Sequence, residues 1–310
     1  MKASGSAAAA AVVAAALPGG LRVPAAQAQP RVHIEAPDAG GFTRPYGGKC
    51  VCLPPQEWFT HGDWVMEKTL ELLQPDHWHS WGDWPEHGAP NRIPMIFATR
   101  YFDHERVRRR MAANSGEFWM NVNEPEMPNQ CNESEEAIAD LTCKLIDIGQ
   151  SVDTEWQWGS PAVTLSTEYN GLAWLTEWAK IMRRKRGIHM PFTWFIHPYT
   201  CNSVQRLEDS MGAWWNWYAV WGGKTPVVIH EVCAEDAPEE VQGDVMRRCF
   251  EMWKDGDVQG VFWFATYRSS VEEQRRQKRI PWQHYALTTL DHNTQTVRFT
   301  DLGNYWKELH

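Results

Sequence analysis

Two glutamates stand at the ends of hydrophobic stretches of the chain. Glu124 follows the segment Phe118-Trp-Met-Asn-Val-Asn123, and Glu231 follows Pro226-Val-Val-Ile-His230. Two carboxyl groups that meet in one site can divide catalytic work, because one can stay protonated as a general acid while the other, ionised, acts as a base or nucleophile. A single glutamate in such a place is more often a helix cap or a loop residue. The pair is therefore informative only if the fold brings the two together.

The elements that must position these glutamates are short hydrophobic runs that alternate with amphipathic stretches. Eight runs are predicted to be strands, at 49–53, 76–81, 93–99, 117–123, 159–164, 192–197, 226–231 and 260–265. Helical patterns occupy the intervals at 64–73, 104–112, 133–148, 172–186, 204–218 and 238–253. This alternation predicts an α/β fold, a single-domain (β/α)8 TIM barrel over residues 48–310. An open doubly wound sheet is the alternative, but no glycine-rich phosphate loop follows the first strand.

A barrel of this kind places its active site at the carboxyl ends of its strands. Glu124 would end the fourth strand and Glu231 the seventh. Their joint position predicts that they lie in one site, which neither residue alone would indicate.

Four motifs resemble the clan A glycoside hydrolases, and within that clan glycoside hydrolase family 128. They are Asn-Val-Asn-Glu-Pro-Glu-Met-Pro-Asn-Gln at 121–130, Ser-Pro-Ala-Val at 160–163, Ile-His-Pro-Tyr at 196–199 and Lys-Thr-Pro-Val-Val-Ile-His-Glu at 224–231. The resemblance implies a retaining, endo-acting β-glucanase with β-1,3-glucan as the favoured substrate. It also implies that Glu124 is the acid/base and Glu231 the nucleophile of a double displacement. The alternatives are a hydrolase or transglycosylase of another β-linked polysaccharide (β-1,4-glucan, mannan or xylan), and a non-catalytic carbohydrate-binding barrel.

Five further residues are predicted to bind substrate: Asn123, His197, Tyr199, Trp81 and Trp263. The resemblance implies that Asn123 bonds the 2-hydroxyl of the sugar, although strict strand alternation would point it away from Glu124. His197 and Tyr199 are expected to orient the nucleophile or contact the sugar, and the two tryptophans to form aromatic walls of the cleft. Ordinary roles compete with each of these: a polar turn, a structural histidine, or core packing.

A metal site is considered and not predicted. The cluster Asp76-His77-Trp-His79 resembles metal-ligand alternation, since residues two apart share a strand face, and Asp83, Glu86 and His87 follow it. The same composition suits a polar substrate-binding loop. Because two carboxyl groups fill both catalytic roles, no cofactor is expected.

The remaining predictions come from composition and from the N-terminus. Residues 1–28 have the features of a secretory signal peptide, and residues 29–47 those of an arm or linker, so a secreted protein is expected. The net charge of −9 argues against nucleic acid as a partner, and 19 tryptophans favour a polysaccharide or oligosaccharide. No run is long enough to span a membrane, and a monomer is expected.

Overall fold

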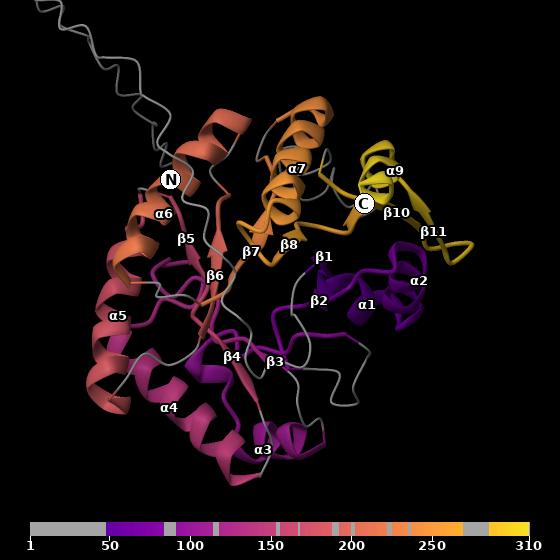
Figure 1. Ribbon diagram of the computed structural model, residues 1–310. Coiled ribbons are helices and arrows are strands. Elements are labelled where there is room, and N and C mark those ends of the chain that lie inside the picture. Colours follow the sequence, from indigo (N-terminus) through magenta and orange to yellow (C-terminus); the bar gives the residue numbers. More distant parts are fainter. Residues whose placement is uncertain are drawn as a thin grey trace, which may run out of the picture. The chain divides into compact units, whose positions relative to one another are not determined.

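Parallel strands surrounded by helices form the centre of the computed structural model (Figure 1). The residues described are 48–83, 91–113, 118–152, 156–166, 168–187, 192–199, 202–221, 225–234, 237–268 and 285–309. All of these fall in one compact unit. The predicted signal peptide and arm, residues 1–28 and 29–47, lie outside the described residues, so both stay predictions.

The strands follow one another around a curled sheet. Their order is β2-β1-β8-β7-β6-β4-β3, with β5 paired to β6, and every pair in this sheet is parallel. The bounds are β1 (Gly48–Cys52), β2 (Trp78–His79), β3 (Phe118–Trp119), β4 (Gln157–Gly159), β5 (Val163–Thr164), β6 (Phe192–His197), β7 (Val227–Val232) and β8 (Gly260–Trp263).

The predicted third strand, 93–99, is not a regular strand but completes the ring. Isolated parallel bridges join Arg92 to Trp78 of β2 and Met95 to Met120 just after β3. Pro94 lies between the bridges and has no N–H to donate, which explains why no continuous ladder forms there. The segment closes the gap between β2 and β3, and the predicted (β/α)8 architecture is confirmed.

The predicted fifth strand, 159–164, is likewise broken into two pieces. β4 ends at Gly159 and β5 begins at Val163, and Pro161 lies in the interruption. Ala162 there forms a bridge with Asn123. The break matters for function because it lies beside Glu124.

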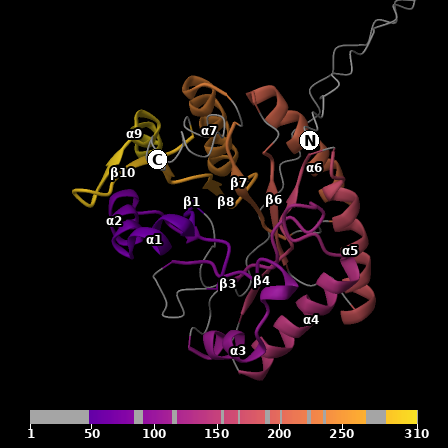
Figure 2. The same ribbon diagram turned by 180° about the vertical axis from the view of Figure 1, so that it is seen from behind.

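The six predicted helices form within a few residues of their predicted ends. They are α2 (Trp64–Leu73), α3 (His104–Ala113), α4 (Glu135–Ser151), α5 (Gly171–Arg186), α6 (Val204–Trp221) and α7 (Glu239–Lys254). The hydroxyl of Ser134 caps α4 by accepting from the N–H of Ala137, and four basic residues end α5, where they complement the helix dipole. Helices α4, α5 and α6 pack in succession along one side of the strands, as both ribbon views show (Figure 2).

Several short elements were not predicted. They are α1 (Pro55–His61), the 3-10 helix η1 (Thr99–Tyr101), β9 (Tyr267–Arg268), β10 (Thr288–Asp291), β11 (Thr296–Phe299) and α9 (Asp301–Glu308). β10 and β11 form an antiparallel hairpin.

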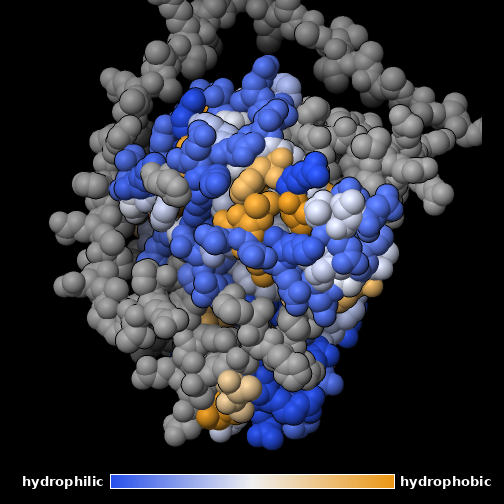
Figure 3. All heavy atoms as spheres, turned by 90° about the vertical axis from the view of Figure 1, so that its right-hand side faces the viewer, coloured by the Kyte–Doolittle hydropathy of each residue, from blue (hydrophilic) through white to orange (hydrophobic). Residues whose placement is uncertain are grey.

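On the face that Figure 3 shows, the surface is mostly hydrophilic with a small hydrophobic area near its middle. Within the described part of the chain, no helix has the length and apolar character needed to cross a membrane.

The strands are hydrophobic on both faces. Phe118, Phe195 and Phe262 pack inside the ring. Their strand neighbours Trp119, Trp194 and Trp263 point outward and pack in the layer between strands and helices. Much of the tryptophan content is therefore core, which leaves the carboxyl ends of the strands as the place for polar side chains.

Candidate active site

A cleft of about 960 Å³ opens at the carboxyl ends of the strands. Every strand position of the barrel contributes to its lining, in agreement with the usual location of a barrel active site. In chain order these contributions include Pro54, Trp81, Phe97, Asn123, Glu124, Thr164, Tyr199, Glu231 and Phe264.

Glu124 enters this cleft because the backbone leaves the strand conformation there. The backbone φ of Glu124 is +41°, in the left-handed region that residues other than glycine rarely adopt. Its N–H donates to the carbonyl of Ala162 across 2.8 Å, and Asn123 forms a bridge with the same residue. The turn breaks strand alternation, and as a result both Asn123 and Glu124 line the cleft.

Glu231 reaches the same cleft from β7 and is almost fully buried. The indole N–H of Trp81 donates to Oε1 of Glu231 across 2.6 Å, and the hydroxyl of Tyr199 donates to Oε2. Burial raises the pKa of Glu231 to about 7, with a further contribution from the charge of Glu124, while His197 and the two donors oppose the shift. The carboxylate is thus held in one orientation by two elements far apart in sequence.

His197 connects the two glutamates. Its Nδ1 lies 2.9 Å from Oε1 of Glu124, and its Nε2 lies 3.7 Å from Oε1 of Glu231. Burial alone would lower the pKa of His197, but the charges of Glu231 and Glu124 outweigh it and the pKa is raised. The imidazole is fully buried and does not line the cleft. Of the two predicted roles for His197, sugar contact or orientation of the nucleophile, this buried place between the glutamates fits orientation.

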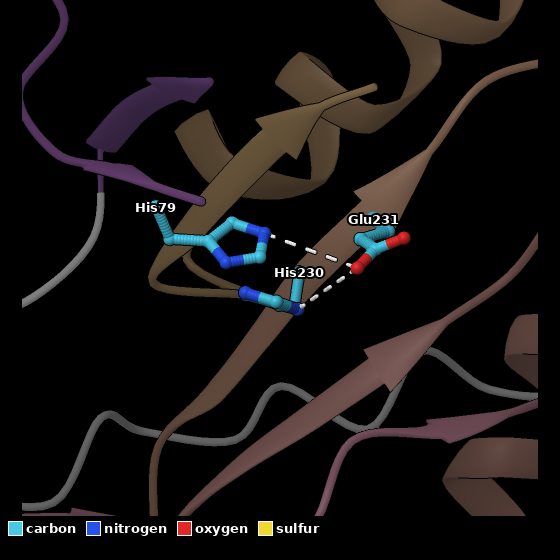
Figure 4. A group of neighbouring side chains, drawn as sticks. All are labelled: His79, His230 and Glu231. Carbon is cyan, nitrogen blue, oxygen red and sulfur yellow. Dashed lines mark ion pairs between the residues drawn. The ribbon is translucent and has the colours of Figure 1, made fainter. Parts of the chain in front are cut away.

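Two other buried histidines converge on Glu231 (Figure 4). His79 Nε2 lies 3.8 Å and His230 Nδ1 3.9 Å from Glu231 Oε1. His230 faces the centre as strand alternation from the inward-facing Val228 dictates, and the β7–β8 register shift between Ile229 and Val232 lets the next residue, Glu231, reach the cleft as well. Burial lowers the pKa of both histidines well below the ordinary value, so both are neutral. The sequence analysis did not predict that His79 and His230 meet at Glu231, because both lie within hydrophobic strand segments. The only signal in the sequence was a histidine inside each of these segments.

These three side chains are close enough to consider as metal ligands, since one ligand atom from each lies within 4.8 Å of the others. The tautomer of His79 argues against this. Its Nδ1 accepts the backbone N–H of Trp81 at 3.3 Å, so the proton of the neutral ring is on Nε2, facing Glu231. The N–H at Nε2 faces the carboxylate from 3.8 Å, without a hydrogen bond to any described residue, and this nitrogen has no lone pair for a metal.

Asp76 and Asp83, considered in the sequence as ligands beside His79, have partners elsewhere. Asp76 accepts the N–H of Lys49 at the start of β1, whereas His79 lies at the end of β2. Asp83 forms an ion pair of 2.7 Å with Arg106. Glu86 and His87 lie outside the described residues.

Asn123 and Trp263 have different outcomes. The amide of Asn123 lines the cleft, where its Nδ2 donates to Gln130 at 3.4 Å. Trp263 is fully buried and its indole donates to the carbonyl of Tyr285 at 2.7 Å. Phe262 occupies the inner face of β8 and alternation turns Trp263 outward, so the structure does not place Trp263 in the predicted cleft wall. Phe264, one residue later, lines the cleft instead.

Glu126 is the remaining acid close to the pair. Its Oε1 accepts the N–H of Thr164 at 2.6 Å, and burial raises its pKa to about 7. Its Oε2 is buried and makes no hydrogen bond to the part of the chain that the structure describes. Glu126 is not among the residues that line the cleft. It therefore supports the backbone of Thr164, which does line the cleft.

The outer part of the cleft carries aromatic side chains that the sequence analysis missed. Phe59 of α1 and Tyr101 of η1 both line it and are 62% and 54% exposed. Aromatic rings this exposed are unusual for a packing role and are available to a ligand.

Comparison with known proteins assigns this chain to a family. Residues 70–292 match the model described as Glycosyl hydrolase catalytic core, and the chain belongs to this family. No curated protein sequence matches it.

Solved structures with a similar fold are members of glycoside hydrolase family 128. An endo-β-1,3-glucanase of subgroup I from Amycolatopsis mediterranei, in complex with laminaritriose, is 17% identical, with a TM-score of 0.60 over 86% of this chain and 100% of that one. An endo-β-1,3-glucanase of subgroup II from Pseudomonas viridiflava is 18% identical, with a TM-score of 0.60 over 85% and 98%. A curdlan-specific exo-β-1,3-glucanase of subgroup III from Blastomyces gilchristii is 18% identical, with a TM-score of 0.58 over 86% and 100%. The predicted resemblance to family 128 is confirmed as one of fold.

Proposed function

We propose that this protein cleaves β-1,3-glucan by a retaining double displacement, with Glu124 as acid/base and Glu231 as nucleophile. The observation that carries the proposal is that both carboxyl groups line one cleft and approach the two nitrogens of a single imidazole, His197.

In the first step, ionised Glu231 attacks the anomeric carbon while protonated Glu124 gives its proton to the leaving oxygen. The bond to the leaving group breaks as the bond to Glu231 Oε1 or Oε2 forms. In the second step, Glu124, now a carboxylate, takes a proton from water, and the resulting hydroxide displaces Glu231 from the sugar. Trp81 and Tyr199 keep the nucleophile in place through both steps.

Features of the cleft support a neutral sugar polymer as the substrate. Trp81, Tyr199 and Phe264 offer aromatic surface beside Glu231. Arg106 is the one cationic side chain among the described residues that line the cleft, and Asp83 already neutralises it. Solved structures with this fold include complexes with laminaripentaose and laminarihexaose, which favours a β-1,3 linkage.

The endo mode and secretion belong to the same proposal. Exposed Phe59 and Tyr101 extend the cleft beyond the two glutamates. An enzyme that cleaves within a long polysaccharide needs such additional binding surface. The N-terminal 28 residues would export the protein to where such polymers occur. Transglycosylation uses the same residues and differs only in the acceptor, a sugar hydroxyl in place of water.

The test is product release from β-1,3-, β-1,4- and mixed-linkage glucans, mannan and xylan, run beside Glu124→Gln and Glu231→Gln. The proposal expects release from β-1,3-glucan alone or foremost, lost in both variants. Glu126→Gln is the matched control, because it removes a neighbouring buried carboxyl group that does not line the cleft. Products of a methanol reaction read by NMR should retain the β configuration, and inverted products would exclude the double displacement.

A further inference from the structure

A continuous line of hydrogen bonds leads from Glu124 into the centre of the barrel. Glu124 Oε1 lies 2.9 Å from Nδ1 of His197, and Nε2 of His197 lies 2.8 Å from Nδ1 of His230. The two rings are stacked, with centroids 5.1 Å apart and an interplanar angle of 23°. Both histidines are fully buried. The proposed mechanism gives no role to His230.

With Oε1 of Glu124 accepting from Nδ1 of His197, counting protons on this line leaves two arrangements. If both rings are neutral, His230 donates its Nδ1–H to His197 and its Nε2 is a bare lone pair in the core. If one extra proton is present, His197 donates from both nitrogens, to Glu124 and to His230, and His230 carries its proton on Nε2. Nε2 of His230 is buried and has no hydrogen-bond partner within the described ranges.

The positions of the carboxyl groups favour the second arrangement. His197 lies within 2.9 Å of Glu124 and 3.7 Å of Glu231, so a charge on its ring faces acids on both sides. Buried carboxylates need such compensation, because burial without a counter-charge is costly. His79 and His230, in contrast, remain neutral, as their lowered pKa values indicate.

We propose that His230 is a positioning residue that keeps His197 doubly protonated, so that one imidazolium serves as counter-ion to Glu231 and Glu124 in turn. This inference rests on the proposed double displacement. In the free enzyme the negative charge is on Glu231. In the glycosyl-enzyme Glu231 is an ester and the charge is on Glu124. Because His197 faces both, the proton on its ring need not move as the charge changes place.

Other groups that face this pair come from several elements. They are Glu231 of β7, Glu124 and Glu126 after β3, His79 of β2, Cys52 of β1, whose thiol donates to the carbonyl of His230, and Tyr199 after β6, which packs edge-on against His197. Burial raises the pKa of the Cys52 thiol well above its ordinary value, and the same holds for the Tyr199 hydroxyl, so both are neutral. His197 is left as the group that can carry the positive charge.

Two variants of similar size distinguish the loss of the hydrogen-bond acceptor at His230 from a change in packing. His230→Asn keeps an oxygen near the position of Nδ1, and His230→Leu does not. Without the acceptor, His197 should lose its second proton, and both carboxyl groups should then ionise at higher pH. We expect His230→Leu to move both limbs of the pH profile of kcat/KM upward by about one unit, and His230→Asn to restore the wild-type profile.

A second readout does not depend on activity. With ¹⁵N-labelled histidine, NMR of the wild-type protein at pH 6 should show both nitrogens of His197 protonated, and His230→Leu should show one. His197→Gln assigns the signal. This result would stand even if no glucan were cleaved, which separates the inference from the proposed function. A singly protonated His197 in the wild type, or equal pH profiles for the Asn and Leu variants, would overturn it.

Discussion

The indole N–H of Trp81 donates to Oε1 of Glu231 across 2.6 Å, joining residues that lie 150 positions apart. Trp81 reaches this position because its φ is +54°, which turns the chain at the end of β2. Tyr199 completes the arrangement by donating to the other oxygen of the same carboxylate.

Removal of either hydrogen-bond donor should lower the activity, because the Glu231 carboxylate would be less well oriented and less fully ionised. Trp81→Phe and Tyr199→Phe keep an aromatic ring and remove one N–H or O–H. A hydrogen bond to a charged group contributes about 1.5–3 kcal/mol, so each variant should lower kcat/KM on β-1,3-glucan by roughly 10- to 100-fold. Each should also move the acidic limb of the pH profile to higher pH, because the ionised form of Glu231 loses support. Unchanged steady-state kinetics in both variants would contradict the role of these donors.

The pH dependence of activity follows from the same carboxyl group. Glu231 must be ionised to attack, and its pKa is raised to about 7. We expect kcat/KM to fall as pH drops below about 7, rather than near the ordinary pKa of glutamate. The rate measured from pH 4 to pH 9 on a soluble β-1,3-glucan checks this, with pH stability of the protein recorded in parallel.

The raised pKa of Glu231 also makes the folded protein less stable at high pH than at low pH. A carboxyl group whose pKa is raised in the folded state favours folding at low pH, and this contribution is lost as pH rises through the folded pKa. For Glu231 the window runs from 4.5 to about 7. Glu231→Gln should therefore increase Tm at pH 8 and change it little at pH 5.

Glu126→Gln provides the matched comparison, since the pKa of Glu126 is also raised to about 7 by burial. It should show the same gain in Tm at pH 8 but keep its glucanase activity. Loss of activity in this variant, with the protein folded, would mean that Glu126 takes part in the chemistry.

The exposed rings of Phe59 and Tyr101 should matter for long substrates only. Stacking of a sugar on an aromatic ring depends on contact area, so Phe59→Ala or Tyr101→Ala should raise KM for long laminari-oligosaccharides by several-fold. Trimers too short to reach these rings should be cleaved as by the wild type. Equal effects on short and long substrates would place the two rings outside the binding surface.

Two glycines give opposite predictions for stability. A methyl group on Gly171, the first residue of α5, would collide with the carbonyl oxygen of Thr164 and approach Glu126. Gly171→Ala should destabilise the fold by about 1–3 kcal/mol and disturb the cleft through Thr164. Gly212, in the middle of α6, is exposed and has no atom near its added methyl. Gly212→Ala should stabilise the protein by roughly 0.5–1 kcal/mol. Urea unfolding of both variants checks the pair.

The prediction succeeded where local pattern carried the information. Helix α2 was predicted with its observed ends, and strand β6 likewise, because apolar spacing reports directly which face a residue buries. It failed where a single backbone feature redirected a side chain. Trp263 is turned outward by the alternation of β8, and no property of tryptophan itself distinguishes this place from a cleft wall.

The meeting of the two buried histidines, His79 and His230, with Glu231 was also not predictable from local pattern. His230 faces the centre of the barrel by ordinary alternation from Val228, and the register shift between β7 and β8 brings Glu231 to the same side. His79 of β2 became part of the site because its ring packs against that of His230 of β7, with centroids 4.0 Å apart, although the sequence suggested partners near Asp76.

By itself, the sequence determined the barrel, the family, and the two strand ends at which Glu124 and Glu231 lie, because hydrophobic periodicity and strand order are properties of the chain. Only the tertiary structure decided how the carboxyl groups are held. The left-handed turn at Glu124, the donors on Glu231 and the ring of His197 between them depend on contacts among segments tens to hundreds of residues apart, and no local pattern encodes those distances.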